Sequence, residues 1–416
     1  DSGADQGDVA EPRAGLGELT LTMPDSLIMN FGVFEDAGLF TFDYDLDFAP
    51  DWLSTSRRIV GEHFNSIQMN DSSEALAGTI VGLLFTEEAT QIEGTYDLIS
   101  PEIYSRLISQ QINEAVAFTD RLARCERYDG LPHARDRAEC FWMSAGKVDF
   151  DLDFNGEWAE LDHDGENYSL GGQKLVSDGI WLGLAASRSN GSSVLANLAD
   201  VSSGEAHQLG AMLKTSRFWG VDLGGAMALG FSNQDVSRNM MLERDDRSDA
   251  TRNSHWLSGR VFFEQTQQRD RWRFTPAFDA GYSQVVAESV DESSNSVWDL
   301  HLDSEKRKQW WVRPRLEVNY EMPFGDSSRV GIDLSIGRRI VLSEKQEGGG
   351  ATLLVAPEGT SPMYTRAFVD DALWESEIGL YWMTHSGVQI KASYGSTSGE
   401  YRTNEEASVS FSIPLR

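Results

Sequence analysis

Two cysteines and seven histidines are the residues of this chain whose spacing we consider first, because thiols and imidazoles bind transition metals and carry out redox and acid-base chemistry. Cys125 and Cys140 are about 15 residues apart, which is wider than the Cys-x-x-Cys spacing of zinc and redox sites. The histidines are scattered, and none lies near another at the spacing of metal ligands. We therefore expect no metal site and no cofactor.

An isolated structural disulfide between Cys125 and Cys140 fits their spacing better. Such a bond requires an oxidising compartment such as the periplasm. Closing a loop of about 15 residues would stabilise the fold by roughly 3 kcal/mol in the chain-entropy model. Two reduced thiols in a core are the alternative.

Two short motifs could suggest an enzyme. Pro24-Asp25-Ser26-Leu27 is similar to the Gly-Asp-Ser-Leu block of lipolytic enzymes. Proline replaces the glycine, however, and a catalytic triad is identified by its geometry and not by a tetrapeptide. Gly348-Gly349-Gly350 is not followed by Lys and Ser or Thr, so it is not a phosphate-binding loop. We expect that the chain is not an enzyme.

The composition is strongly acidic. The 416 residues include 35 Lys+Arg and 66 Asp+Glu, which gives a net charge of -31. This balance argues against a nucleic-acid partner, because nucleic acids need a clustered basic surface. No stretch approaches the roughly 18 apolar residues of a transmembrane helix. Composition alone would therefore indicate a soluble acidic protein.

The first 130 residues change from strand-like to helical. Residues 1–50 alternate apolar and polar side chains from Phe40 to Phe48, which predicts strands with one buried face. Residues 51–130 carry apolar side chains at helical spacing, and the longest stripe predicts an amphipathic helix over 101–124. In a soluble protein, such a helix would pack on a core.

Residues 131–416 contain twelve strand-like segments with alternating apolar and polar residues. Several reach the roughly 9–11 residues that cross a bilayer obliquely. Tryptophans near the segment ends match the aromatic girdles of outer-membrane barrels. We expect a twelve-stranded antiparallel transmembrane β-barrel, with strands at about 140–153, 168–177, 180–188, 204–217, 218–232, 254–267, 272–288, 308–323, 329–342, 372–384, 387–396 and 404–415.

The connections between these segments alternate between short and long. Outer-membrane barrels have short periplasmic turns and longer outer loops, whereas a soluble sandwich has no reason to sort loop lengths in this way. The alternation of short and long connections therefore favours a closed barrel over a soluble β-rich binding protein. The long connections are expected at 154–167, 189–203, 233–253, 289–307 and 343–371, with a shorter one at 397–403.

In such a barrel, the residues that alternate with the lipid-facing ones face the lumen. Charges of both signs occupy these positions, so we expect paired or hydrated groups and not a selectivity ring of one sign. The expected pore-lining residues are Lys174, Asp222, Arg260, Glu264, Asp279, Arg313, Arg315, Glu317, Asp333, Glu375, Glu377 and Lys391.

Three runs of small residues lie inside the predicted strands, namely Gly171-Gly172, Gly210-Ala211 and Gly224-Gly225-Ala226. Glycine in a strand often marks the close approach of another backbone, and it also relieves barrel curvature. Both interpretations stay open from the sequence.

The helix over 101–124 directly precedes the first strand, so its polar face could lie in the lumen. We expect Arg106, Arg121 and Arg124 to pair with lumen carboxylates. The predicted Cys125–Cys140 disulfide would then tie the end of the helix to the base of the first strand.

The whole arrangement resembles the C-terminal region of autotransporters, the type V secretion family of Gram-negative bacteria. Residues 40–67 (FTFDYDLDFAPDWLSTSRRIVGEHFNSI) resemble the junction that ends a β-solenoid passenger. Residues 99–125 (ISPEIYSRLISQQINEAVAFTDRLARC) resemble the linker helix. CFWMSAGKVDF through GLAASRSNG, WRFTPAFDAGYSQV and VRPRLEVNYEM resemble first and middle barrel strands.

The resemblance implies an outer-membrane translocator that secretes its own N-terminal passenger and anchors it at the cell surface. It implies three regions: 1–50 as the end of a β-strand-rich passenger, 51–130 as a helical junction with the pore helix, and 131–416 as the barrel. The expected partners are outer-membrane lipid, lipopolysaccharide and the barrel-assembly machinery, and the expected state is a monomer.

Asn113-Glu114 is a candidate cleavage site, because some members of this family cleave after an asparagine in the pore. A solvated asparagine on a helix is the alternative. The alternative function for the whole chain is a porin-like channel for small solutes.

Overall fold

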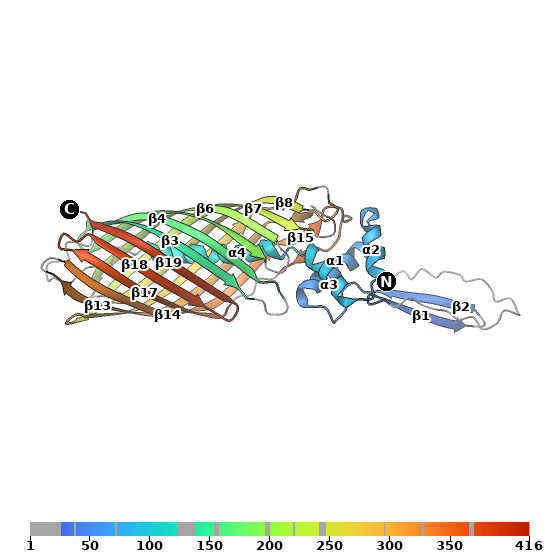
Figure 1. Cartoon of the computed structure of the whole chain (residues 1–416), viewed down its shortest axis with the longest axis horizontal. Coiled ribbons are helices and arrows are strands. Elements are labelled where there is room, and N and C mark those ends of the chain that lie inside the picture. Colours follow the sequence, from blue (N-terminus) through green and yellow to red (C-terminus); the bar gives the residue numbers. More distant parts are fainter. Residues whose placement is uncertain are drawn as a thin grey trace.

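The computed structural model describes residues 26–36, 39–70, 73–122, 139–153, 158–195, 200–218, 221–240, 247–294, 296–325, 328–365 and 370–415. A long barrel fills one side of the molecule, with several helices and a hairpin at one end (Figure 1). Within the described ranges, no helix is both long and apolar enough to span a membrane.

The barrel is a closed ring of 12 long antiparallel strands, as predicted. The first and last strands pair from Cys140 to Leu152, which leaves no free edge on this ring. In order around the ring, the strands are β3 (Cys140–Leu152), β4 (Leu161–Ser177), β5 (Ile180–Leu195), β6 (Asp200–Phe218), β7 (Val221–Asn239), β8 (Arg247–Gln265), β10 (Trp272–Ala287), β13 (Glu305–Phe324), β14 (Ser328–Gly348), β17 (Ala372–Thr384), β18 (Gln389–Ser398) and β19 (Arg402–Pro414).

Side-chain alternation explains the ring. In β14, Ile332, Leu334 and Ile336 are exposed on the outside, while Asp333 between them points to the lumen and bonds to Asn319 and Lys391. Because a strand turns each successive side chain to the opposite face, this pattern presents an apolar surface to lipid and a polar one to the interior.

The two ends of the barrel differ. At one end, hereafter the turn end, neighbouring strands follow each other closely, as at Ser177 and Ile180. At the other, hereafter the loop end, the long connections hold the short strands β11 (Val290–Asp291), β12 (Leu300–Leu302), β15 (Gly350–Leu353) and β16 (Met363–Tyr364), which form a separate sheet. Short β9 (Gln267–Arg269) extends the β8–β10 connection at the turn end.

Three expected loops contain long stretches of strand in the structure. The connections predicted at 154–167, 189–203 and 233–253 contain the loop-end parts of β4 to β8. In this part of β5, the outward residues Asn190 and Ser192 are polar, and so are the inward residues Ser189 and Ser193. The apolar-polar contrast therefore vanishes although the hydrogen-bonded ladder continues, and the sequence pattern misses these residues.

The tryptophans only partly form girdles. Trp272 and Trp382 are exposed near the turn end, and Trp310 and Trp374 are exposed nearer the loop end. These four fit the aromatic belts that bound a lipid-facing band. The expectation is wrong for four other tryptophans, which point inward and are buried, namely Trp142, Trp181, Trp256 and Trp311. Trp219 lies outside the described residues.

The glycine runs have two different explanations. A Cβ on Gly171 would lie 2.6 Å from the ring of Trp142, and one on Gly224 would lie 2.2 Å from the ring of Phe262. These glycines therefore make room for inward aromatic rings of neighbouring strands. At Gly210, a Cβ would meet Leu122, just beyond the pore helix, at 2.7 Å. This glycine lets the helical segment approach the wall.

The N-terminal region forms a hairpin and a helical cap. β1 (Met29–Asp36) and β2 (Leu39–Leu46) pair as an antiparallel sheet. The described part of this region is an antiparallel hairpin, because only two residues separate the strands in the sequence and the chain must reverse. The β-solenoid remnant expected over 1–50 stays a prediction. The cap consists of α1 (Thr55–Met69), η1 (Glu74–Leu76), α2 (Ala77–Leu84) and α3 (Ala89–Ile99).

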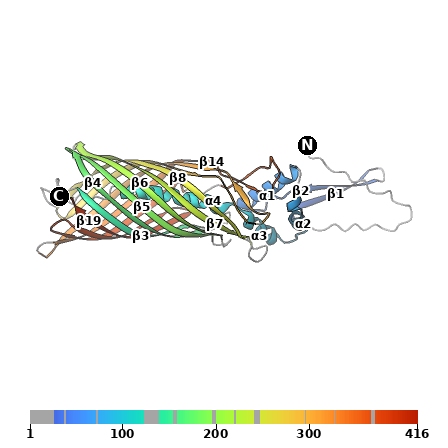
Figure 2. The same ribbon diagram turned by 90° about the horizontal axis from the view of Figure 1, so that it is seen from above.

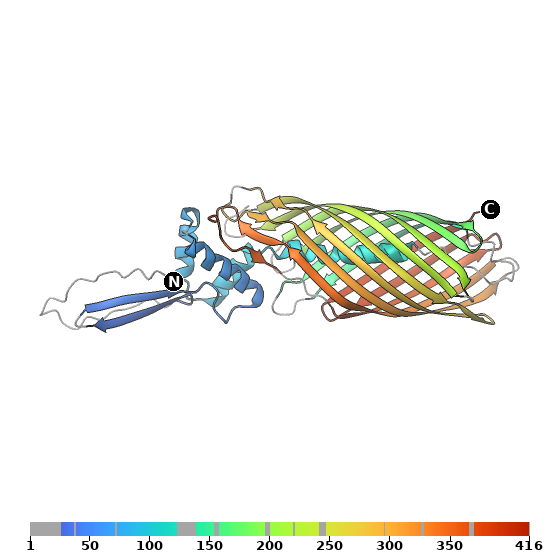
Figure 3. The same cartoon turned by 180° about the vertical axis from the view of Figure 1, so that it is seen from behind.

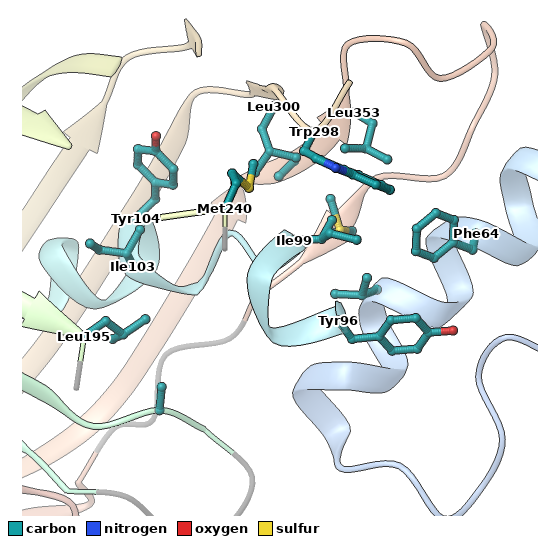
Figure 4. Packing of buried hydrophobic residues seen from close by; sticks show 14 of the residues in the cluster. Phe64, Tyr96, Ile99, Ile103, Tyr104, Leu195, Met240, Trp298, Leu300 and Leu353 are labelled. Carbon is teal, nitrogen blue, oxygen red and sulfur yellow. The ribbon is translucent and has the colours of Figure 1, made fainter. Parts of the chain in front are cut away.

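The cap packs on the loop end of the barrel. One apolar cluster joins Phe64 of α1 and Tyr96 of α3 to Trp298, Leu300 and Leu353 of the outer connections (Figure 4). The cap and the loop end therefore share a core.

Candidate functional site

The candidate site is the lumen, which contains α4 (Glu102–Arg121). The helix leaves the cap at the loop end and runs along the inside of the barrel (Figure 2). Its polar side chains are buried, with only 2% of Arg106, 4% of Gln110 and 7% of Asn113 exposed. Because burying a polar group without a partner is costly, these side chains need partners on the wall.

Asp120, in the last turn of α4, meets two arginines of the wall. Its carboxylate oxygens lie 2.7 Å and 2.8 Å from the guanidinium of Arg313 on β13. Arg260 of β8 lies 3.2 Å from the same carboxylate. Asp279 of β10 bonds to both arginines, at 2.9 Å and 2.8 Å. The helix thus ends in an ion-pair network that spans three strands.

The network continues onto the next two strands of the ring, β14 and β17. Glu375 of β17 accepts hydrogen bonds from Arg313 at 2.8 Å and is 2.9 Å from Arg339 of β14. Arg339 also donates to the amide oxygen of Asn113 on α4 at 3.2 Å. One network of charged and polar groups therefore connects two turns of the helix to five strands, β8, β10, β13, β14 and β17.

Gln110 and Gln111, in the middle of the helix, bond to uncharged side chains of the wall. Gln110 bonds to the ring of His163 on β4 at 2.8 Å and donates to Glu114 at 3.0 Å. Gln111 donates to Ser232 of β7 at 3.0 Å and accepts from Ser254 of β8 at 2.9 Å. These bonds fix the rotation of the helix about its own axis.

The loop end of α4 is held by buried carboxylates. Glu102 accepts from Arg106 on the next turn at 2.8 Å and from the backbone N–H of Ala159 at 2.8 Å. Tyr104 donates to Glu292 at 2.7 Å, and Arg238 binds the same carboxylate through both of its oxygens. The start of the helix is thus joined to the barrel rim and to an outer connection.

Among the described residues, the lumen beyond the helix, toward the turn end, is lined by ion pairs between side chains of the wall. Lys214 lies 3.4 Å from both Asp222 and Glu264. Lys391 lies 3.3 Å from both Asp333 and Glu377. Arg315 contacts Glu264, Asp279 and Glu317. Both signs are interleaved, so this section carries no ring of one charge.

The structure places all the expected pore-lining residues but one on the inward face. The exception is Lys174, which is exposed and shares the parity of Leu170 on the outside of β4. Its neighbour Gln173 takes the inward position, because the alternation of β4 is one residue out of step with the expectation.

Of the expected helix arginines, Arg121 pairs with an inward carboxylate, Glu406 of β19, at 2.9 Å. Arg106 pairs with Glu102 of its own helix instead, because the two are one turn apart and both are buried. Arg124 and Cys125 lie outside the described residues. The predicted disulfide therefore stays a prediction, and Cys140 is the first residue of β3.

Sequence reasoning missed three residues that join the helix to the wall, namely Asp120, Arg339 and His163. The sequence identifies Asp120 as a polar residue of the helix. The expected ion pairs, however, had arginines on the helix and carboxylates on the wall, whereas here the carboxylate is on the helix and the arginines are on the wall. Arg339 lies at the loop-end side of β14, just before the bulged stretch of its pairing with β13.

The helical cap is joined to the longest outer connection through His63 of α1. Its ring Nδ1 lies 2.6 Å from the carbonyl oxygen of Ser361, and its Nε2 lies 3.4 Å from the backbone nitrogen of Leu353. This arrangement requires a neutral ring that donates at one nitrogen and accepts at the other. Burial lowers the pKa of the His63 imidazole, although the bond to Ser361 partly opposes this.

Comparisons with known proteins agree with this geometry. The family model of the autotransporter β-domain matches residues 141–395. The translocator domain of the autotransporter NalP from Neisseria meningitidis matches with a TM-score of 0.60 at 11% identity, over 76% of this chain and 100% of that chain. The β-domain of the Bordetella autotransporter Brka matches with a TM-score of 0.49 at 11% identity, over 67% and 99%. No curated protein is similar in sequence.

Proposed function

This chain belongs to the autotransporter family, and we propose that α4 is the passenger linker held in the pore when secretion is complete. The barrel is an outer-membrane translocator that serves the secretion of its own passenger. Translocator domains of this kind are transport units. What the proposal adds is the role of the helix and of the wall residues that face it.

The observation that carries the proposal is the two-point contact between Asp120 and Arg313, supported by Arg260. A channel built for solutes gains nothing from arginines paired with a helix that fills the lumen. A translocator needs such groups, because the helix must stay in place after the passenger has left. We therefore assign Asp120, Asn113 and Arg121 to positioning the helix.

The direction of the chain supports the same role. α4 starts beside the outer connections, and β3 starts at the turn end. Outer-membrane barrels have their longer loops outside and their short turns in the periplasm. The chain would then run from the cell surface, through the lumen, to the periplasmic side. In this view, residues 1–50 are the end of the passenger, 51–130 the junction with its pore helix, and 131–416 the barrel.

We also propose two partners beyond the outer membrane and the passenger. The outward carboxylates of Asp149, Asp162 and Asp164 lie toward the loop end, where divalent cations could bridge them to lipopolysaccharide. The barrel-assembly machinery is the expected catalyst of insertion. Cleavage after Asn113 stays a prediction, and the mass of the chain recovered from outer membranes would test it.

A porin-like channel is the competing function, and conductance in planar bilayers separates the two. The full chain should conduct poorly, and a chain without residues 1–122 should open a stable pore. A porin would conduct equally in both forms. A heat-modifiable gel shift must show that the shortened barrel is folded, and equal conductance of two folded forms would refute the role of α4 as a plug.

A further inference from the structure

A groove crosses the outside of the barrel on β5 to β13. Its volume is about 550 Å³, and its lining is almost entirely apolar. Figure 3 shows these strands side by side, from green to orange, on one face of the barrel. The groove lies in the lipid-facing band, since Leu213, Met227 and Val261 along it are exposed apolar residues.

Small outward residues on four successive ring strands make the floor. These are Ala211 of β6, Gly225 of β7, Gly259 of β8 and Ala280 of β10. Larger side chains flank the floor on both sides. Phe263 and Phe278 lie toward the turn end, and Leu229 and Leu257 lie toward the loop end.

The two glycines of the floor have no internal reason to be glycine. A Cβ on Gly225 would come no closer than 3.6 Å to its neighbours, and one on Gly259 no closer than 3.5 Å. Neither is among the glycines with positive φ. By contrast, the inward glycine Gly230 lies under the ring of Trp256, where a Cβ would come within 2.1 Å. Glycine weakens a strand interior, so its use at the outer positions points to something outside the wall.

One end of the groove meets a cationic patch. Tyr282 and Trp310 close the groove, with ring centroids 4.7 Å apart. One step further toward the loop end, Lys306, Lys308 and Lys345 face outward in register with each other and with Glu347. Lys308 pairs with Glu347 at 2.6 Å, so the patch keeps a net positive charge. Such a patch is notable on a chain with a net charge of -31.

We propose that this groove binds one acyl chain of a lipid A molecule, whose phosphate lies at the patch of Lys306, Lys308 and Lys345. The groove runs from Leu182, near the turn end of β5, to Trp310, on the loop-end side of β13. An acyl chain would therefore point its headgroup toward the loop end. This proposal rests on the orientation argued above, in which the loop end faces the cell surface and hence the leaflet that contains lipid A.

The chemistry of the site matches that ligand class. The bulky side chains beside the groove would hold a flat lipid layer away from the small residues of the floor. A single acyl chain that enters the groove can contact these floor atoms and so gains van der Waals contacts. Lysine ammonium groups attract phosphate as point charges, and an aromatic pair at the boundary suits the region between acyl chains and headgroups. The groove is continuous with the lipid interface of the barrel, which selects a lipid over a protein as its occupant.

The test uses the full chain in nanodiscs of phosphatidylethanolamine and phosphatidylglycerol, with and without purified lipid A. After extraction into detergent, native mass spectrometry counts the lipid A that stays bound, and thermal unfolding reports stabilisation. We expect one retained lipid A and a higher Tm for the wild type. Equal retention of phosphatidylglycerol would overturn the assignment to lipid A.

Variants then locate the site. Gly225→Leu and Gly259→Leu place a Cβ no closer than 3.5 Å to a backbone atom and extend a bulky side chain from the floor. Each should lower lipid A retention about tenfold, the equivalent of roughly 1.4 kcal/mol. Ala392→Leu, at an exposed outward position of β18, is the matched control and should retain lipid A. If the floor variants retained lipid A like the control, the groove would not be the site.

The headgroup is tested independently of folding changes in the groove. Lys306→Gln, Lys308→Gln and Lys345→Gln together should weaken retention and make it less sensitive to salt. Unchanged retention would remove the phosphate contact from the proposal. None of these variants touches α4, so conductance and passenger secretion report on the pore helix separately.

Discussion

Asp120 of α4 and Arg313 of β13 form a two-point contact inside the barrel, in which Oδ1 accepts from Nη2 at 2.7 Å and Oδ2 accepts from Nη1 at 2.8 Å. The two residues are 193 positions apart in the sequence. The contact therefore exists only when the barrel is closed and the helix is inside it, and it reports on the finished state of the translocator.

Removing this carboxylate should loosen the helix. Asp120→Asn keeps the shape of the side chain but leaves Arg313 with Asp279 and Glu375 as its only charged partners in the described part of the chain. Asp120 is one-third exposed to the lumen, with 33% of its side chain accessible. We therefore expect a loss of only about 1–2 kcal/mol in holding the helix, less than for a fully buried pair.

Single-channel recording measures this loss as more frequent opening of the full chain. Asp270→Asn is the matched control, because it removes one charge from an exposed turn outside the lumen. If the two variants opened equally often, Asp120 would not hold the helix.

A second prediction concerns the fit between Gly210 of β6 and Leu122. A methyl group on Gly210 would lie 2.7 Å and 2.9 Å from the two terminal carbons of Leu122. Gly210→Ala should therefore push the end of the helical segment away from the wall, at a cost of about 1–3 kcal/mol. Leu122→Ala in the same chain should recover much of this loss.

Thermal unfolding followed by gel shift measures both variants. Gly225→Ala serves as the control, because its new methyl group has no neighbour closer than 3.6 Å. Additive losses in the Gly210→Ala, Leu122→Ala double variant would argue against direct contact.

Sequence reasoning recovers the barrel because one bilayer imposes one pattern on every strand. In β14, Val330, Ile332 and Leu334 must be apolar to face lipid, so the period of two is visible without any partner strand. Beyond the bilayer this pressure ends. In β5, the outward Asn190 and Ser192 alternate with Ser189, Gly191 and Ser193, so no apolar-polar pattern is left. The predicted strand therefore stops, although the real one continues to Leu195.

The contacts of the helix could not be recovered in the same way. Which arginine contacts Asp120 depends on the stagger of the strands and on the rotation of α4 about its axis. Neither quantity produces a pattern in the local amino-acid sequence. The sequence indicates that charges of both signs line the lumen. It does not indicate that Arg339 reaches Asn113, because that pairing depends on where β14 passes the helix.

The predicted disulfide gives a third test. A bond between Cys125 and Cys140 would close a loop of about 15 residues and contribute roughly 3 kcal/mol. The unreduced chain should then run faster on a denaturing gel than the reduced one and should not react with maleimide. Cys125→Ser and Cys140→Ser should each lower the Tm to the same extent as reduction. Two reactive thiols in the unreduced, unfolded chain would refute the bond.

The attachment of the cap to the barrel should depend on pH through His63. Burial holds the pKa of this ring below its ordinary value of 6.5. The folded state therefore takes up a proton less readily than the unfolded one, so the contribution of His63 is fully present above pH 6.5 and is lost as the pH falls below it. A protonated ring would also turn a second N–H toward the backbone N–H of Leu353.

We expect faster hydrogen exchange in residues 350–365 at pH 5.5 than at pH 7.5, after correction for intrinsic rates. His301 has the opposite effect on stability. Its hydrogen bond to Asp291 raises the pKa of its ring, so the folded state binds a proton more readily than the unfolded one and gains stability as the pH falls. The experiment is therefore done with His301→Gln in the background. His63→Gln should remove the pH dependence of exchange, since glutamine does not titrate. A variant that kept the full dependence would assign it to another group.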